Sequence, residues 1–407
     1  MSGGVDSSLA AALLVEEGFD VVGVTLLVGG AGDEVSAAGR GAGLSRGTVD
    51  RARDVARALG IRHLVVDAGA AFRRDVLEPF RAGYLNGRTP NPCVECNARV
   101  KFPVLLEHAR ALGCDVLATG HYARTDRDPD RGCIRLLRGA DRSKDQSYFL
   151  WGLSQDHLRF ARFPVGHLTK EEVRARAQAR GFRAEGWRES QDVCFGSGDP
   201  YFRWLEAGAD VGPRGGWIRD TSGRVLGSHR GVHRYTIGQR RGLGIALGKP
   251  RYVVRIDPED RSVVVGNAAD LMSDALVGSD VHVVSGGDVG EGPVWAKIRY
   301  RHAPSKARVE RVPGGIRVEF EAPQRAVTPG QSVVFYRGDE VLGGAVIRAP
   351  GGRPAAARGN RAGAVGGVGG GTQDLTGSSV APYSPDGERG IRRRDGRVVE
   401  GGGLENR

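Results

Sequence analysis

The residues of clearest chemical character near the start of the chain form the run Ser-Gly-Gly-Val-Asp-Ser-Ser, positions 2–8, directly before an apolar helical segment. The two glycines lack a Cβ and let the backbone approach a ligand closely. Their amides, those at the helix start and the serine hydroxyls suit an anion such as a phosphate group. Asp6 is suited to orienting a loop amide or to helping to hold Mg²⁺. The lysine of the G-x-x-x-x-G-K-[ST] pattern is missing, which excludes a kinase-type or GTPase-type phosphate loop.

A pair of cysteines, Cys93 and Cys96, follows the sequence Thr-Pro-Asn-Pro and precedes a predicted helix. The two prolines predict a rigid, extended loop. Cys96 lies near the helix start, where the helix dipole and the cations Arg99 or Lys101 favour the reactive thiolate. A zinc half-site and a redox Cys-x-x-Cys pair are the alternatives. A zinc site needs two further ligands nearby, and the sequence has no second Cys-x-x-Cys.

The other three of the five cysteines differ in their surroundings. Cys194 stands among polar residues in the run Glu-Ser-Gln-Asp-Val-Cys-Phe, which argues against a buried structural role. Cys114 begins a predicted strand and Cys133 lies in Cys-Ile-Arg-Leu-Leu, so both are interpreted as packing residues. Five cysteines in 407 residues are too few for a disulfide scaffold.

The elements that must position these residues alternate between strand and helix in the first half of the chain. The Gly-rich stretch 29–47 is predicted to be a loop. The alternation predicts a parallel sheet covered by helices on both faces. The expected helices are 7–17, 49–59, 72–85 and 102–112, and the expected strands are 19–28, 62–66 and 115–119.

The pattern changes after about residue 195. Residues 217–240 show no long helical period, whereas short alternating apolar runs from 252 to about 347 predict an antiparallel barrel or sandwich. Residues 350–407 hold few large apolar side chains and are predicted to be disordered. The predicted domains are a catalytic domain (1–195), a small central domain (196–265), a C-terminal β-barrel (266–349) and the tail (350–407).

The net charge of +11 suits a polyanionic partner such as nucleic acid. The tail holds nine arginines against six acidic residues, so most of the positive excess lies on the body of the chain. No apolar run has the length of a membrane-spanning helix, and no secretion signal is evident. We therefore expect a cytoplasmic protein without a membrane partner.

The run at 2–8 resembles the pyrophosphatase-type loop of enzymes that cleave ATP between the α and β phosphates and adenylate an oxygen of the substrate. With five further motifs, the chain resembles the bacterial tRNA-specific 2-thiouridylases from residue 1 to about 347. The motifs are GRTPNPCVECN (87–97), ATGHYAR (118–124), KDQSYFL (144–150), ESQDVCF (189–195) and HRYTIGQRRGLGI (233–245). The resemblance implies an adenine nucleotide alpha hydrolase-like first domain and 2-thiolation of the wobble uridine of tRNA.

The resemblance also implies roles for individual residues. Cys96 is then the nucleophile, Cys194 carries a persulfide, and Cys93 is a possible assisting thiol. The residues implied for ATP are Ser2, Gly3, Gly4, Val5, Asp6, Ser7, Ser8, Leu26 and Gly120. Those implied for tRNA or its target base are Asn91, Pro92, Cys93, His121, Lys144, Asp145, Gln146, Arg299, Tyr300 and Gln331.

The implied reaction uses ATP with Mg²⁺ to adenylate the C2 oxygen of a flipped-out uridine. The persulfide sulfur then replaces AMP, and Cys96 resolves the persulfide through a transient disulfide with Cys194. Depressed thiol pKa values are expected for this chemistry. The sulfur donor is a cysteine desulfurase or a relay protein. As a second mechanism, Cys93, Cys96 and Cys194 have the number of thiols that a [4Fe-4S] cluster with one open iron requires.

Three features depart from the family pattern. One is the segment 39–55, where the family usually has a CS-x-x-D-x-x-DA pattern. Some members carry Asp at the position of Cys93. A loop of this type also normally follows the strand at the centre of the sheet, and here Met1 directly precedes Ser2. We expect either that the sheet lacks its first strand or, as we favour, that the natural start lies upstream. The rival functions are a nitrogen-transferring synthetase with the same loop, and an RNA-binding protein with a damaged ATP site.

Overall fold

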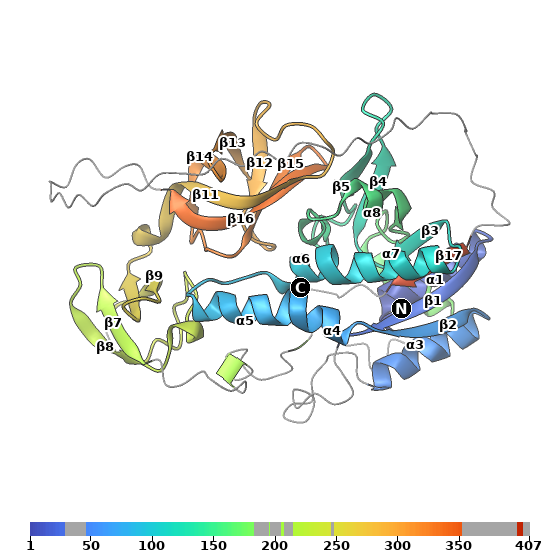
Figure 1. Cartoon of the computed structure of the whole chain (residues 1–407), viewed down its shortest axis with the longest axis horizontal. Helices are drawn as coiled ribbons and strands as arrows, with labels where there is room; N and C mark the ends of the chain where they lie inside the picture. Colours follow the sequence, from blue (N-terminus) through green and yellow to red (C-terminus); the bar gives the residue numbers. More distant parts are fainter. Residues whose placement is uncertain are drawn as a thin grey trace, which may run out of the picture.

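The computed structural model of the chain describes residues 1–28, 46–182, 195, 205–206, 215–245, 248–351 and 397–401. Figure 1 shows an α/β domain beside a β-barrel, with a small separate sheet below the barrel. Within the described residues, no helix combines the length and apolar character needed to cross a bilayer.

The α/β domain is built on a sheet of five strands whose pairings are all parallel. The predicted parallel sheet is therefore confirmed. Strand β1 is buried at six consecutive positions, as expected for a strand covered on both faces. The strand order is β2 (Arg62–Asp67), β1 (Asp20–Leu27), β17 (Arg397–Gly401), β3 (Val116–Thr119) and β6 (Ala161–Arg162).

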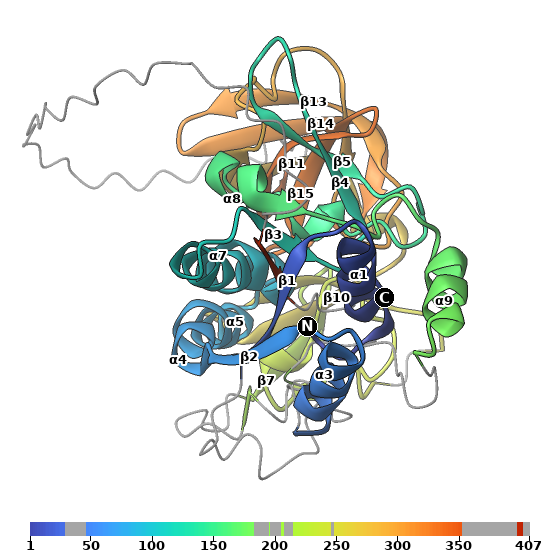
Figure 2. The same cartoon turned by 90° about the vertical axis from the view of Figure 1, so that its right-hand side faces the viewer.

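Helices cover both faces of this sheet (Figure 2). Between them they bury an apolar core that includes much of β1 and β3. On one face lie α1 (Val5–Glu16), α3 (Arg46–Ala58) and α9 (Lys170–Ala179); on the other lie α4 (Gly69–Phe72), α5 (Glu78–Leu85) and α7 (Phe102–Ala111). Short helices α6 (Pro92–Glu95) and α8 (Gln155–Phe160) complete the domain.

The centre of the sheet is occupied by β17, from the far end of the chain. It pairs with β1 from Asp20↔Arg397 to Val24↔Gly401, and with β3 on its other side. The position between β1 and β3 is thus taken by a segment from the C-terminal part of the chain. The predicted disorder of the tail is wrong for these five residues; 352–396 and 402–407 lie outside the described part.

The central region forms a four-stranded sheet with its own small core around Ile218, Val253 and Val263. The absence of a long helix in residues 217–240 is confirmed, because only one short 3-10 turn interrupts the strands there. The strand order is β8 (Val225–His229), β7 (Gly216–Asp220), β10 (Ser262–Gly266) and β9 (Tyr252–Asp257).

The C-terminal region is a closed antiparallel barrel, as predicted, because β11 pairs with both β14 and β16. Alternating burial along β13 and β14 places every second side chain in the barrel core. The strands are β11 (Met272–Val283), β12 (Val294–Lys297), β13 (Ser305–Val312), β14 (Gly315–Arg325), β15 (Ser332–Arg337) and β16 (Glu340–Gly351).

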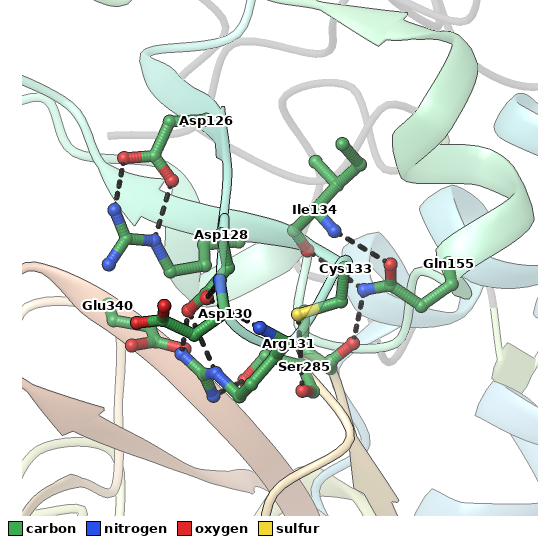
Figure 3. Close-up of polar contacts among 11 residues, drawn as sticks. Asp126, Asp128, Asp130, Arg131, Cys133, Ile134, Gln155, Ser285 and Glu340 are labelled. Atoms are coloured by element: carbon green, nitrogen blue, oxygen red, sulfur yellow. Dashed lines mark hydrogen bonds and ion pairs between the residues drawn. The ribbon is translucent and has the colours of Figure 1, made fainter. Parts of the chain in front are cut away.

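A hairpin of the catalytic domain, β4 (Ala123–Arg127) and β5 (Ile134–Arg138), extends the barrel sheet by pairing with β16. The tip of the hairpin is anchored to the barrel by polar contacts (Figure 3). Arg131 binds Asp128 at 2.7 Å and Glu340 at 2.9 Å. Cys133, interpreted as a packing residue, donates its thiol to the carbonyl of Ser285. The sequence did not predict this hairpin, and through it the two domains share one core.

Candidate active site

The phosphate loop leads into α1, whose N-cap is Gly4. The hydroxyl of Ser8 donates to the carbonyl of Gly4 at 2.8 Å, and that of Ser7 donates to it at 3.2 Å. The hydroxyls of Ser2 and Ser7 lie 3.1 Å apart. No side chain caps the first turn, so its amides remain directed toward the loop. This arrangement has the donors and helix dipole that an anion requires.

At two positions near the phosphate loop, a side chain larger than that of glycine would collide with neighbouring atoms. Gly3 has φ +67°, and a Cβ there would lie 2.9 Å from the Thr48 carbonyl of α3. A Cβ on Gly120, just after β3, would lie 2.8 Å from the backbone of Asp6 and Ser7. Gly120 thus packs directly against the first turn of α1, and its predicted place in the ATP site stays a prediction.

The carboxylate of Asp6 is buried, with a side chain 3% exposed, and is engaged by two partners. Lys170 donates to Oδ1 and Oδ2 at 2.8 and 2.7 Å, and the hydroxyl of Tyr122 donates to Oδ1 at 2.6 Å. These contacts do not fit the predicted role of Asp6 in holding Mg²⁺. The described residues contain no cluster of three or more acidic, His or Cys side chains arranged to hold a metal.

The proline-rich loop leads into α6, which contains Cys93. A π-helical turn that begins at Cys96 (Cys96–Lys101) follows, and then α7. Asn91 caps α6 by accepting the amide of Cys93 at 3.2 Å, and Pro92 occupies the first helical position. Cys93 is half-buried, whereas Cys96 is 2% exposed. A π-turn of this kind is often found at functional sites.

The predicted depression of the thiol pKa is contradicted for Cys96. Burial raises the pKa of Cys96, and this effect outweighs the opposing effects of the Lys101 charge and of a backbone hydrogen bond. The prediction considered the helix start and the nearby cation but not the desolvation of the thiol. A reactive thiolate at Cys96 therefore requires a change in its surroundings from those described here.

The barrel holds the proline-rich loop in place. The Thr89 amide donates to Pro329, and the side-chain amide of Gln331 donates to the Thr89 carbonyl, each at 2.8 Å. Gly330 packs so closely on Thr89 and Pro90 that a Cβ would lie about 2.9 Å from their backbones. The structure therefore brings Gln331 together with the loop of Asn91 and Cys93, although 242 positions separate Gln331 from Thr89.

The residues predicted to contact tRNA divide into an accessible and a buried group. Lys144 and Tyr300 line a surface cavity of about 690 Å³. Four further cations that were not predicted also line the cavity: Arg138, Arg142, Lys297 and Arg301. Arg299 is partly exposed and donates to the carbonyl of Arg325. A cavity lined by these cations suits a polyanion.

Asp145, Gln146 and His121 belong to the buried group. Asp145 accepts the backbone amides of Gly139 and Ser147 and also contributes to the lining of the cavity, whereas Gln146 exchanges hydrogen bonds with the backbone of Tyr122. His121 contacts Thr119, and burial lowers its pKa well below the usual value, which keeps the ring neutral. In this conformation these three side chains stabilise the site through their contacts with other groups of the protein.

The sequence did not predict that Lys170 and Tyr122 bind the carboxylate of Asp6. Tyr122 lies inside the quoted motif Ala-Thr-Gly-His-Tyr-Ala-Arg, and Lys170 carries no signal other than its place at the start of an amphipathic segment. Leu26 is buried near the end of β1, and its predicted contact with ATP stays a prediction. Cys194 lies outside the described residues, so its distance from Cys96 stays open to experiment.

Three family descriptions match consecutive parts of the chain. Residues 1–197 match a tRNA methyl transferase HUP domain, 209–267 a tRNA methyl transferase PRC-barrel domain, and 273–347 an aminomethyltransferase beta-barrel domain. The fold and the phosphate loop therefore define a nucleotide-binding HUP protein with two appended β domains.

Curated relatives narrow this class. The chain is 43% identical to the tRNA-specific 2-thiouridylase MnmA of Acetivibrio thermocellus, over 86% of this chain and 98% of the relative. It is 47% identical to the protein of the same name from Moorella thermoacetica (85% and 98%) and 48% identical to that from Geobacter metallireducens (86% and 95%). The chain belongs to the tRNA-specific 2-thiouridylase family of enzymes.

Proposed function

We propose that this enzyme uses ATP to replace the C2 oxygen of the wobble uridine of tRNA by sulfur. The observation that carries the proposal is the position of the Asn91–Cys93 loop. Thr89, two residues before it, is hydrogen-bonded to Gln331 of the barrel, and its Pro92 and Cys93 lie in α6, which leads directly to Cys96 in the same domain as the phosphate loop. A family of 2-thiouridylases and a cation-lined cavity beside Tyr300 support tRNA as the substrate.

In the proposed reaction, the phosphate loop holds the ATP phosphates while the C2 oxygen of uridine attacks the α-phosphate and pyrophosphate leaves. The terminal sulfur of a persulfide on Cys194 then forms a bond to C2. Cys96, as thiolate, attacks the Cys194 sulfur, which breaks the persulfide S–S bond. AMP leaves with the former C2 oxygen, and a Cys96–Cys194 disulfide remains. A reductant and a sulfur donor, either a cysteine desulfurase or a relay protein, restore the enzyme.

The described residues supply no complete set of protein ligands for either implied inorganic group, Mg²⁺ or a [4Fe-4S] cluster. Mg²⁺ can accompany ATP as its counter-ion, but Asp6 is already bound by Lys170 and Tyr122 and does not fit as a protein ligand. For a [4Fe-4S] cluster, the described part supplies only Cys93 and the buried Cys96 close together. The proposed reaction uses no cluster. Anaerobic purification followed by iron and sulfide analysis tests this: full thiolation by an iron-free protein removes the cluster mechanism.

The proposed division of labour follows the predicted domains, with catalysis in 1–195, RNA contact in 196–265 and 266–349, and a tail at 350–407. The proposed setting is the cytoplasm, where tRNA and sulfur donors are present. The ranges of the matching family descriptions lie close to the first three divisions.

The test is mass analysis of tRNA nucleosides from a host that lacks its own 2-thiouridylase and carries this gene. We expect 2-thiouridine to reappear with the wild-type chain and to be absent with Cys96→Ser or Cys194→Ser. Absence of 2-thiouridine with the wild-type chain contradicts the proposal. If both cysteine variants still released pyrophosphate from ATP with tRNA while the wild-type chain formed no 2-thiouridine, nitrogen transfer, which needs no thiol, would be favoured instead.

A further inference from the structure

The buried carboxylate of Asp6 stands in the first turn of α1, directly after the phosphate loop. Its partners come from two distant parts of the chain: Tyr122 follows β3, and Lys170 begins α9. Lys170 spans both carboxylate oxygens, and its ammonium lies 5.5 Å from the centre of the Tyr122 ring. All three residues are 6% exposed or less.

The charge of Asp6 has a specific consequence at this place. A buried carboxylate loses the stabilisation of water and depends on its paired cation and hydrogen bonds. Without compensation, its charge would also oppose the helix dipole that attracts phosphate to the N-terminus of α1. Lys170 balances the carboxylate, so that the loop can receive an anion while the first turn of the helix stays anchored.

The two partners of Asp6 are themselves fixed. Lys170 follows Thr169, which caps α9 in a reciprocal capping box with Glu172. The Lys170 amide also donates to Asp141 at 3.0 Å. Tyr122 is held through its backbone, which donates to the side chain of Gln146 at 3.0 Å and accepts the Gln146 amide at 2.8 Å. Both partners of Asp6 are therefore held by the loop 141–146, which also carries Lys144 of the cation-lined cavity.

We propose that Lys170 and Tyr122 are positioning residues for ATP, which act through Asp6 by neutralising and anchoring the first turn of α1. The proposal rests on the ATP-dependent reaction proposed above and deepens it. Neither side chain needs to touch the nucleotide. Their removal should therefore weaken nucleotide binding and leave tRNA binding to the cavity at Lys144 and Tyr300 nearly unchanged.

The experiment measures the Kd of ATP by calorimetry and the Kd of tRNA by filter binding, on the full chain, for Lys170→Met, Lys170→Arg, Tyr122→Phe and the wild type. Arg180→Met is the matched control. Arg180 pairs with Glu16 at 2.6 Å and joins the same two helices, α1 and α9, at the ends remote from the phosphate loop. If Lys170 only docked α9 on α1, then Lys170→Met and Arg180→Met should raise the Kd of ATP to a similar extent.

We expect Lys170→Met to raise the Kd of ATP at least about tenfold, since it leaves a buried charge unpaired. Tyr122→Phe should raise it less, and Lys170→Arg, which keeps the charge, should recover part of the loss. If Lys170→Met does not fold, the double variant Asp6→Asn/Lys170→Met serves instead, because it removes both charges. It should fold and should bind ATP more tightly than the single variant Asp6→Asn, which keeps an unpaired lysine.

Equal ATP affinity in Lys170→Met and the wild type overturns the inference, as does an equal loss in Arg180→Met. A double variant that folds but binds ATP no more tightly than Asp6→Asn also overturns it. If the wild-type chain binds no ATP at all, the proposed function fails first and the inference fails with it. These outcomes differ in the wild-type measurement, so the two failures are distinguishable.

Discussion

The side-chain amide of Gln331, at the entrance to β15 of the barrel, donates to the carbonyl of Thr89 across 2.8 Å. Thr89 begins the rigid Thr-Pro-Asn-Pro segment that carries Asn91 and leads to Cys93. The barrel thus fixes the loop of the catalytic domain at which the target base is proposed to bind. This relationship gives Gln331 a role through the loop even where it makes no contact with RNA.

The first prediction concerns this hydrogen bond. Gln331→Ala should lower kcat/KM for tRNA thiolation about tenfold, because a loosened loop misplaces Asn91 and Cys93. The Kd of ATP should not change, and the free energy of unfolding should fall by only about 1 kcal/mol. Gln178→Ala, at an exposed position of α9, is the control. A Gln331→Ala enzyme with wild-type kcat/KM would contradict the proposed positioning.

The second prediction concerns the order in which the thiols react. Because burial raises the pKa of Cys96 and only 2% of the residue is exposed, little thiolate is available there at neutral pH. Iodoacetamide should label the half-buried Cys93 at least about tenfold faster than Cys96 in the enzyme without substrates. Peptide mass analysis over time measures both rates, and the buried Cys114 is the internal control.

Adding ATP and tRNA should speed the labelling of Cys96 if the reaction requires its thiolate. Faster labelling of Cys96 than of Cys93 in the enzyme alone would show that its thiol is not desolvated in solution. Labelling in urea supplies the rate of each unfolded thiol, which separates the effect of burial from intrinsic reactivity.

Features made of neighbouring residues could be predicted from the sequence, whereas contacts between distant residues could not. The phosphate loop was predictable because its glycines, hydroxyls and following helix are contiguous, and the loop of Cys93 and Cys96 was predictable for the same reason. The partners of Asp6 were not, since 164 positions separate it from Lys170. The sequence therefore left the role of Asp6 open between backbone orientation and Mg²⁺.

Burial is the second relation that local sequence does not carry. Arg99 and Lys101 beside Cys96 predict a thiolate, but the packing of α7 and of neighbouring apolar side chains desolvates the sulfur and reverses the direction of the pKa change. His121 shows the same limitation. Its polar character and motif suggest an outward role, yet Phe102 and Phe163 enclose it.

The third prediction concerns the pH dependence of stability. Burial lowers the pKa of His121 well below its usual value, and burial, the N-terminal ammonium and Arg53 lower that of His63 to about 4. Both rings are neutral when folded, whereas the unfolded chain binds protons below about pH 6.5. The stability from these groups is thus present above about pH 6.5 and is lost as the pH falls toward the folded pKa values.

Urea unfolding at about pH 7.5 and about pH 5.5 should therefore show a smaller free energy of unfolding at the lower pH. His121→Gln, which cannot take up a proton, should lose less stability between these two pH values than the wild type. His167→Gln, at an exposed position, is the control. An equal loss in His121→Gln and the wild type would contradict the neutral, buried state of His121.

The last prediction concerns β17, the strand at the centre of the parallel sheet. Val399 pairs with Val22 of β1 on one side and with Leu117 of β3 on the other. Proline at this position removes a backbone donor from a central strand and leaves a carbonyl of a neighbouring strand unpaired, which costs about 1–3 kcal/mol. Val399→Pro should therefore lower the melting temperature of the catalytic domain and weaken ATP binding, because α1 packs on β17 as well as on β1.

Val399→Ile is the matched control, since it keeps both the backbone donor and a β-branched side chain. Hydrogen exchange adds a local measurement: amides of β1 and β3 should exchange faster in Val399→Pro than in Val399→Ile, while those of the barrel strand β13 should not differ. Identical exchange in the two variants would mean that β17 is not paired in solution. In that case another segment must fill the gap between β1 and β3, because two unpaired inner edges in a buried parallel sheet would leave their backbone donors and acceptors without partners.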